Sequence, residues 1–317
     1  MGRWHAHSAK QSGAQITAII DSDLKAAERL AARFGGTSFS TLDQAIKNAT
    51  FDVLHVCTPP GSHVELAKQA LNANKHLIIE KPITSSTSEL NALLEIAEAR
   101  GLLLCPVHQF AFQHGVLAAK AELAKRSSAP LAVAFDFASA GGEGRNTTEL
   151  NSLLIEILPH PLSILSEVWP DQGLKHESLC VTNPRPGEML AHGMLADMLV
   201  TIKISLFARP THCTMTIYHQ EGAIHLNLFH GFAVFESAKV SRLNKITQPF
   251  LLSLKTLYTA GINLARRAVR GEPAYPGLRL LIQQCYQAIE SASPGPITGE
   301  HNLGVASLCE QFKQRLT

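Results

Sequence analysis

The sequence has few cysteines, and they form no recognisable metal or disulfide motif. Only six cysteines occur in 317 residues, and none belongs to a CxxC pair. Small secreted domains depend on dense disulfide frameworks, and structural zinc sites use cysteines or histidines paired at short spacing. The HExxH motif of zinc peptidases is also absent. We therefore expect buried, reduced cysteines and no metal site.

A long uncharged hydrophobic run is missing as well. The longest apolar stretch, PFLLSLKTLYTAGINLA from Pro249, is interrupted by Lys255 and by serine and threonine at helical spacing. This stretch is too polar to cross a bilayer. The first residues, MGRWHAHSAK, lack the apolar core of a signal peptide. Together these features predict a cytoplasmic protein.

Neither sign of charge dominates the sequence. There are 28 lysines and arginines against 26 aspartates and glutamates, a formal net charge of +2. Such a balance gives no broad attraction to nucleic acid or to an anionic membrane. We expect a small-molecule ligand and neither of those two partners.

The pattern of the remaining residues predicts two domains. Residues 1–112 alternate short apolar runs with amphipathic ones, which is typical of βαβ units on a parallel sheet. Residues 113–317 contain successive strand-like runs without helices between them, which predicts an α+β domain with a largely antiparallel sheet. In the first domain we expect strands at 15–21, 52–58, 76–80 and 102–107, and helices at 24–34, 41–48, 63–72 and 86–99.

Polar residues follow the predicted parallel strands. Ligands of open α/β sheets bind at the carboxyl ends of the strands, so these residues are candidates for a binding site. The candidates are Asp21, the turn with Thr58, Pro59 and His63, the pair Glu80 and Lys81, and the pair His108 and Gln109. Each has a simpler interpretation as well. An exposed lysine is usually only solvated, and Asp21 could cap the next helix, although Asp23 suits that capping position better.

The order IIDSD, CTPPGSH, IIEKP and PVHQ resembles the nucleotide-binding half of the glucose-fructose oxidoreductase/inositol dehydrogenase (Gfo/Idh/MocA) family. The resemblance implies a Rossmann-like domain in which Lys81 contacts both the substrate and the nicotinamide. A carboxylate at Asp21 would bind the adenosine ribose and repel a 2'-phosphate, which favours NAD over NADP. The resemblance implies that the cofactor-binding residues are Gly2, Arg3, Trp4, Asp21, Thr58, Pro59, His63, Glu80, Lys81 and Gln109.

The segment LLIEILPHPLSIL carries a second candidate site. Glu156 and His160 are four residues apart, which places both on one face of a helix predicted over residues 148–168. Pro159 and Pro161 should kink or break that helix, because an internal proline removes a hydrogen bond at a cost of about 3 kcal/mol. The alternative interpretation of His160 is a buried structural histidine.

This pair resembles the DxxxH pair of the same family, with glutamate in place of aspartate. The resemblance implies that His160 accepts a hydroxyl proton and that Glu156 orients it or holds the substrate. Histidine, with an ordinary pKa of about 6.5, can accept a proton near neutrality. Lys81 would stabilise the alkoxide while hydride passes to the nicotinamide. We expect an NAD(P)-dependent oxidoreductase acting on a sugar, sugar nucleotide or cyclitol, and a homo-oligomer formed through the C-terminal sheet.

The sequence departs from the family at its N-terminus. Gly2 matches the last glycine of the GxGxxG fingerprint, and the first strand and the other two glycines are absent. Either the sequence is a shortened version of a complete protein, or cofactor binding has been lost and the chain is a non-catalytic binding or regulatory protein. A hydrolase using Glu156 and His160 is a third hypothesis, although no GxSxG nucleophile elbow accompanies them.

Overall fold

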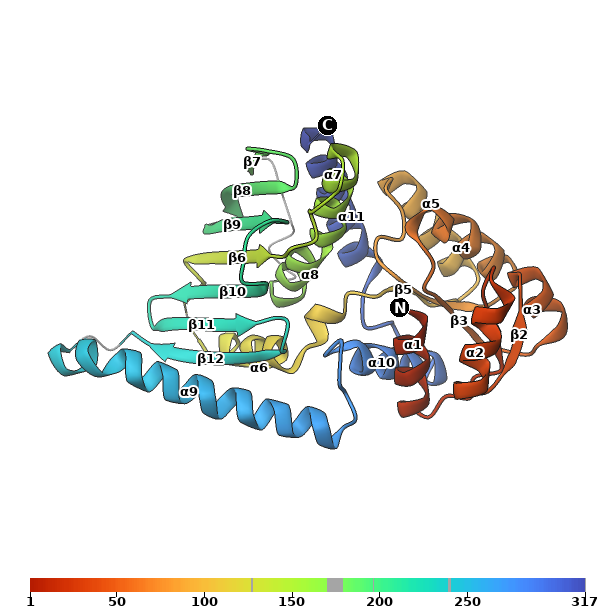
Figure 1. Ribbon diagram of the computed structural model, residues 1–317, viewed down its shortest axis with the longest axis horizontal. Helices are drawn as coiled ribbons and strands as arrows, with labels where there is room; N and C mark the ends of the chain where they lie inside the picture. Colours follow the sequence, from red (N-terminus) through yellow and green to blue (C-terminus); the bar gives the residue numbers. More distant parts are fainter. Residues whose placement is uncertain (127, 170–178, 196, 239–240, 317) are drawn as a thin grey trace. The chain divides into compact units, whose positions relative to one another are not determined.

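The computed structural model describes residues 1–126, 128–169, 179–195, 197–238 and 241–316 (Figure 1). The chain divides into two compact units. The first unit combines Met1–Val107 with Leu278–Ala306, and the second combines His108–Gly277 with Ser307–Thr317. The sequence predicted one boundary after residue 112 and a continuous second domain over 113–317. In the structure, the chain instead returns to the first unit at Leu278.

The first unit is Rossmann-like, with parallel strands separated by helices, as the sequence predicted. Its strands are β1 (Ala18–Ile20), β2 (Thr37–Phe39), β3 (Val53–Val56), β4 (His76–Ile79) and β5 (Leu104–Pro106). Its helices are α1 (Gly2–Gln11), α2 (Leu24–Phe34), α3 (Leu42–Asn48), α4 (His63–Asn72), α5 (Thr87–Ala99), α10 (Leu278–Glu290) and the first part of α11 (Gly299–Leu316). A short 3-10 helix, η1 (Pro60–Ser62), precedes α4.

Local sequence explains where these helices begin. The side chains of Asp23, Thr41 and Ser86 accept hydrogen bonds from the first turns of α2, α3 and α5. The core of the unit is aliphatic. Its central strand β4 contributes Leu77, Ile78 and Ile79, which are fully buried, as expected for a strand that is covered on both faces.

The parallel strands form two separate sheets. β1 pairs with β2, and β3, β4 and β5 pair in that order. Among the described residues, β1 has no partner besides β2, and β3 has none besides β4. The β1 residues are accordingly only half-buried, unlike those of β4. In the doubly wound strand order 3-2-1-4-5-6, these two free edges flank the position of strand 1.

The second unit is built on a seven-stranded sheet in the order β12-β11-β10-β6-β9-β8-β7. All neighbouring strands are antiparallel except β6 and β9, which confirms the predicted antiparallel character. The strands are β6 (Ala132–Ala138), β7 (Cys180–Thr182), β8 (Glu188–Leu195), β9 (Met198–Ser205), β10 (His212–His219), β11 (Gly222–Asn227) and β12 (Phe232–Ser237). The helical elements are η2 (Gln109–Phe112), α6 (His114–Leu123), α7 (Thr147–Ile157), α8 (Pro159–Val168), α9 (Arg242–Val269) and the end of α11.

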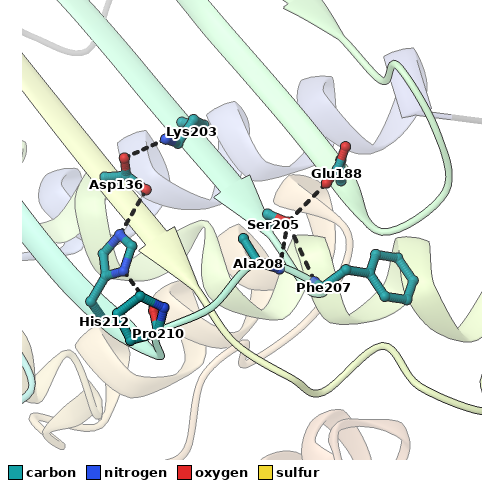
Figure 2. A network of polar contacts seen from close by, with 8 residues as sticks. All are labelled: Asp136, Glu188, Lys203, Ser205, Phe207, Ala208, Pro210 and His212. Atoms are coloured by element: carbon teal, nitrogen blue, oxygen red, sulfur yellow. Dashed lines mark hydrogen bonds and ion pairs between the residues drawn. The ribbon is translucent and has the colours of Figure 1, made fainter.

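One face of this sheet carries polar side chains that bond to one another. Figure 2 shows Asp136 of β6 between Lys203 of β9 and His212 of β10, with separations of 2.5 Å and 3.0 Å. Near the end of β9, Ser205 donates a hydrogen bond to Glu188 at 2.9 Å. These contacts cross three strand pairs and therefore help to fix the register of the sheet.

Two expectations from the sequence concern the cysteines and membrane crossing. No disulfide joins any of the six cysteines, all of which the structure describes. Four are buried as expected, whereas Cys57 is half-buried and Cys180 on β7 is exposed. Across the described ranges, no helix combines the length and the apolar character that a bilayer crossing requires.

Candidate functional site

The strand ends of the first unit lie level with one another. The register pairs Val56 with Ile79 and Ile79 with Pro106, so β3, β4 and β5 finish at one edge of their sheet. The turn that begins after Val56 carries Thr58 and Pro59, and the turn after Ile79 carries Glu80 and Lys81. The structure thus brings the predicted residues of these two turns to the edge where open α/β sheets bind ligands.

His63 connects these two turns. Its Nδ1 atom lies 2.8 Å from the carbonyl oxygen of Pro82, and its Nε2 atom lies 2.8 Å from that of Thr58. The side chain is fully buried at the start of α4. Both ring nitrogens therefore lie within hydrogen-bond distance of backbone carbonyl oxygens, and His63 positions the turns that carry Thr58 and Lys81. A direct contact of His63 with a cofactor stays a prediction.

Glu80 belongs to a buried hydrogen-bonded chain that the sequence did not reveal. Its carboxylate lies 3.1 Å from Nε2 of His5 in α1. Nδ1 of His5 lies 3.0 Å from Nδ1 of His55, and Nε2 of His55 lies 2.8 Å from the hydroxyl of Tyr286 in α10. These hydrogen bonds connect β3, α1 and α10 to the turn that begins with Glu80. They therefore hold the first residue of that turn in place.

The charges along this chain follow from burial and contact. Burial would lower the pKa of His5, but the sulfur of Cys57 and the carboxylate of Glu80 outweigh that effect and raise the pKa to about 10. Burial and the positive charge of His5 lower the pKa of His55 to about 3. A doubly protonated His5 can donate to both Glu80 and a neutral His55, and His55 can then donate to Tyr286. One consistent set of protons therefore accounts for every hydrogen bond from Glu80 to Tyr286.

The start of α1 carries the predicted residues Gly2, Arg3 and Trp4. Met1 precedes the helix without a side-chain cap, and its carbonyl oxygen accepts hydrogen bonds from the N–H groups of Trp4 and His5. The N–H groups of Gly2 and Arg3 are the ones that could bind an anion. The Arg3 guanidinium lies 4.6 Å from the centre of the Trp4 ring. This helix end has the polarity that a phosphate needs, with an arginine beside it.

Asp21 and Asp23 have separate local roles at the end of β1. Asp23 caps α2 by accepting a hydrogen bond from the N–H of Lys25. Asp21 accepts one from the N–H of Asp23 at 2.9 Å, and its side chain is exposed. The helix cap therefore does not explain why a carboxylate stands at position 21.

In the second unit, Gln109 and His160 occupy neighbouring elements. The ring of His160 in α8 stacks on Phe110 of η2, with centroids 4.1 Å apart and an interplanar angle of 16°. Gln109 is buried, and its Oε1 atom has no hydrogen-bond partner among the described residues. A buried acceptor of this kind is costly unless a ligand or water supplies the donor. Phe110 was not predicted as a site residue, because an aromatic residue in an apolar segment carries no distinguishing signal.

The break predicted beside His160 is confirmed. Helix α7 ends at Ile157, and α8 begins at Pro159. Proline is tolerated there because the N–H of the first helical residue needs no partner within the helix. Glu156 therefore lies in α7 and His160 in α8, rather than in one continuous helix. Their pairing as a proton-transfer couple stays a prediction.

The described residues also bear on metal and cofactor binding. They include no cluster of three or more histidine, cysteine or carboxylate side chains that could hold a metal ion. Within the first unit, the uncapped start of α1 and the exposed Asp21 fit a dinucleotide, which offers phosphates and ribose hydroxyls.

Several known proteins are similar to this chain. dTDP-3,4-didehydro-2,6-dideoxy-alpha-D-glucose 3-reductase of Saccharopolyspora spinosa is 34% identical over 101 residues, 32% of this chain and 30% of that protein. UDP-N-acetylglucosamine 3-dehydrogenase of Acidithiobacillus ferrooxidans is 32% identical over 108 residues, 34% of each chain. These alignments thus span about a third of the length of either curated relative.

Solved structures share the fold over nearly the whole chain. The structure of the Acidithiobacillus ferrooxidans dehydrogenase superposes with a TM-score of 0.71 at 18% identity, covering 100% of this chain and 95% of that one. WlbA dehydrogenase from Bordetella pertussis, solved in complex with NADH and UDP-GlcNAcA, superposes with a TM-score of 0.70 at 15% identity, covering 98% and 90%.

A family model described as "Oxidoreductase family, NAD-binding Rossmann fold" matches residues 1–108. The match covers the strand-end turns of the first unit. Through these residues, about a third of the chain, this protein is similar to the NAD-binding part of the Gfo/Idh/MocA oxidoreductases.

Proposed function

We propose that this protein is an NAD-linked oxidoreductase that transfers hydride between nicotinamide and a hydroxyl or keto carbon of a sugar, sugar nucleotide or cyclitol. The observation that carries the proposal is the register of β3 and β4, in which Val56 pairs with Ile79. This register places the Thr58 turn beside the Glu80–Lys81 turn at the edge of the sheet where such folds bind ligands. Dinucleotides bind at this edge in doubly wound folds.

The first unit supplies the groups that would hold the cofactor. The N–H groups of α1 and the side chain of Arg3 would bind the pyrophosphate, and Asp21 would accept hydrogen bonds from the ribose. His63 and the His5–Glu80 chain would act indirectly, by keeping both turns in place. An exposed carboxylate at position 21 favours NAD, because it would repel a 2'-phosphate.

The chemical step needs a proton acceptor and a group that stabilises an oxyanion. Bound NAD supplies the hydride acceptor. In the oxidation direction, His160 takes the proton of the substrate hydroxyl as the C–H bond at the same carbon breaks, and the carbinol becomes a carbonyl. The ammonium of Lys81 stabilises negative charge on the oxygen, and Glu156 orients His160 or binds a second hydroxyl.

Two further features of the proposal concern the substrate and the assembly. Both named curated relatives act on nucleotide-linked sugars, which favours this substrate class over a free sugar. The polar face of the seven-stranded sheet, with Asp136, Lys203 and His212, would contact a second copy of the chain. Sedimentation of the wild type beside an Asp136→Arg variant would test this interface.

The central experiment is a thermal unfolding measurement with and without NADH. A ligand present at 100 times its dissociation constant stabilises the folded state by about 2.7 kcal/mol, so a binding-competent chain should show a clear upward shift of the midpoint. NADPH provides the comparison for cofactor preference. A lack of any shift with either nucleotide would contradict the cofactor assignment for the chain in this form.

A non-catalytic binding or regulatory protein is the second candidate. In the part of the chain that the structure describes, β1 and β3 each have an edge without a strand partner, next to the position where doubly wound folds carry a glycine-rich strand. The same measurement on a chain with an added N-terminal apolar strand ending in Gly-x-Gly separates the two candidates. A shift with the added strand supports the oxidoreductase, whereas its absence in both forms supports the binding protein.

A further inference from the structure

Helix α9 exposes an unusual amount of apolar surface. Six of its leucine, isoleucine and phenylalanine side chains are between 63% and 72% exposed. We call them the outer face of α9: Leu243, Ile246, Phe250, Leu254, Leu257 and Leu264. Their spacing of three, four or seven residues places them on one side of the helix. Monomeric proteins rarely expose contiguous apolar patches above a few hundred Å², and larger ones mark interaction sites.

The opposite side of α9 attaches the helix to the second unit. Figure 1 shows α9 running beside β12, and the two elements are in contact. Gln248 donates to the carboxylate of Glu236, and Lys255 donates to the carbonyl oxygen of Phe235. Asn263 is buried and donates to the carbonyl oxygen of His230 at 2.8 Å. These polar side chains face the second unit, so the outer face of α9 points away from the sheet.

The charges of α9 are all of one sign. The helix contains five basic residues and no aspartate or glutamate, and Arg270 follows its last turn. The basic residues are Arg242, Lys245, Lys255, Arg266 and Arg267. Burial, Arg266 and Arg270 together lower the pKa of His114 in α6.

This combination distinguishes between possible occupants of the outer face. A second α9 would cover the apolar side chains, but paired helices use opposite charges beside the seam, and two copies of α9 bring only like charges together. An anionic lipid surface accepts apolar side chains and attracts lysine and arginine at the same time. The formal net charge of +2 for the whole chain gives no sign of this local concentration.

We propose that α9 is an interfacial membrane helix that lies flat on an anionic phospholipid surface, with its outer face inserted among the lipids. The exposed basic residues Arg242, Lys245 and Arg270, near the two ends of the helix, contact the phosphate groups. The helix does not cross the bilayer, which agrees with the lack of a membrane-spanning helix in the described residues. The binding would bring an enzyme of the proposed class to a lipid surface, but it does not depend on that activity.

Vesicle flotation tests the proposal with the full-length protein. The wild type should float with vesicles of phosphatidylcholine and phosphatidylglycerol, and should remain at the bottom of the gradient with phosphatidylcholine alone. High salt should weaken the binding, because it screens the attraction to the phosphates. A protein that floats with neither kind of vesicle would overturn the proposal, as would equal binding to both at every salt concentration.

Two neighbouring substitutions form a matched pair. Leu257→Glu and Thr256→Glu add the same charge to adjacent exposed positions, but only position 257 belongs to the outer face. Thr256→Glu should weaken binding by about fivefold through charge alone. Leu257→Glu should weaken it at least about tenfold more, because a carboxylate replaces an inserted leucine.

Sedimentation of the same two variants tests whether the outer face of α9 instead binds a second copy of the chain. If the wild type is an oligomer that only Leu257→Glu dissociates, and if it does not float, the outer face binds a second copy and the lipid proposal is wrong. Equal losses of flotation in both variants would also contradict it, because the apolar face would then have no part. Circular dichroism should show both variants folded, since each position is exposed.

Discussion

The imidazole of His63 lies 2.8 Å from the carbonyl oxygen of Pro82, across two turns that are separated by a full βα unit. The same ring reaches the carbonyl oxygen of Thr58. The position of Lys81, one residue before Pro82, thus depends on a buried side chain at the start of α4. A substitution of His63 is therefore expected to displace Lys81, although Lys81 itself is unchanged.

Substitution His63→Ala should reduce both stability and cofactor binding. It takes the ring away from the carbonyl oxygens of Thr58 and Pro82, at a cost of about 1–3 kcal/mol, and releases the turns at both strand ends. Urea unfolding measures the first effect, and NADH titration of the folded protein measures the second. His230→Ala, at an exposed position of the second unit, is the control and should change neither. Unchanged NADH affinity in His63→Ala would show that the turns do not need the ring.

Removal of the Lys81 ammonium should affect the reaction more than binding. In a form of the protein that turns over substrate, Lys81→Ala should lower kcat at least about a hundredfold, as expected when one preorganised stabilising contact is lost. Steady-state kinetics with a nucleotide-linked sugar would measure it. Near-normal turnover would refute the role assigned to this residue.

The two aspartates after β1 provide a test of cofactor preference. Asp21→Ala should raise the affinity for NADPH relative to NADH by about tenfold, the equivalent of about 1.4 kcal/mol, because the repulsion of a 2'-phosphate is removed. Asp23→Ala should instead cost about 1 kcal/mol of stability through loss of the α2 cap and should leave the preference unchanged. A preference that follows Asp23 rather than Asp21 would reverse the assignment.

Gly277 sets the backbone around Gln109. It has a φ of +92°, and an added Cβ atom would lie 2.2 Å from the carbonyl oxygen of Gln109. Gly277→Ala should therefore destabilise the protein by more than about 1 kcal/mol. Gly261→Ala is the matched control, since nothing lies within 4 Å of its added Cβ. That substitution should stabilise α9 by up to about 1 kcal/mol, because alanine favours helix. Urea unfolding compares the two, and equal effects would contradict the steric argument.

The His5–His55 pair predicts how stability depends on pH. The pKa of His55 is lowered to about 3, below the unfolded value of 6.5, so the unfolded chain binds more protons between those values and stability falls as pH decreases through them. The pKa of His5 is raised to about 10, so its contribution is fully present below 6.5 and is lost as pH rises towards 10.

Urea unfolding between about pH 5 and 9 should therefore show a maximum near neutrality, with each residue contributing up to about 1.4 kcal/mol per pH unit. His55→Leu should flatten the acid side of this profile. An acid side that is equally steep in the variant would assign the dependence to other groups.

Much of the first unit could be predicted from the sequence, because its signals are local. The bounds of α2 and α4 agree with the predicted helices, and the cap at Asp23 follows from its position before an amphipathic run. The three residues of β2 were missed, since so short a strand has no readable alternation. The break before α8 was predicted because proline acts on its own helix turn.

Contacts between distant parts of the sequence could not be predicted. The hydrogen bond from His55 to Tyr286 joins residues 231 positions apart, and neither has a neighbour in sequence that marks it. The same holds for the His5–Glu80 pair and for the stacking of Phe110 on His160. These contacts depend on which helix returns to which sheet, and local periodicity carries no information about that choice.

The return of the chain to its first unit also has a consequence for biosynthesis. Residues Leu278–Ala306 complete a unit whose other part ends at Val107. At a translation rate of about 5–20 residues per second, these two parts leave the ribosome roughly ten to thirty seconds apart. During that interval the nascent Rossmann half lacks the helix that supplies Tyr286, so His55 stays without this hydrogen-bond partner until residues 278–306 have been synthesised.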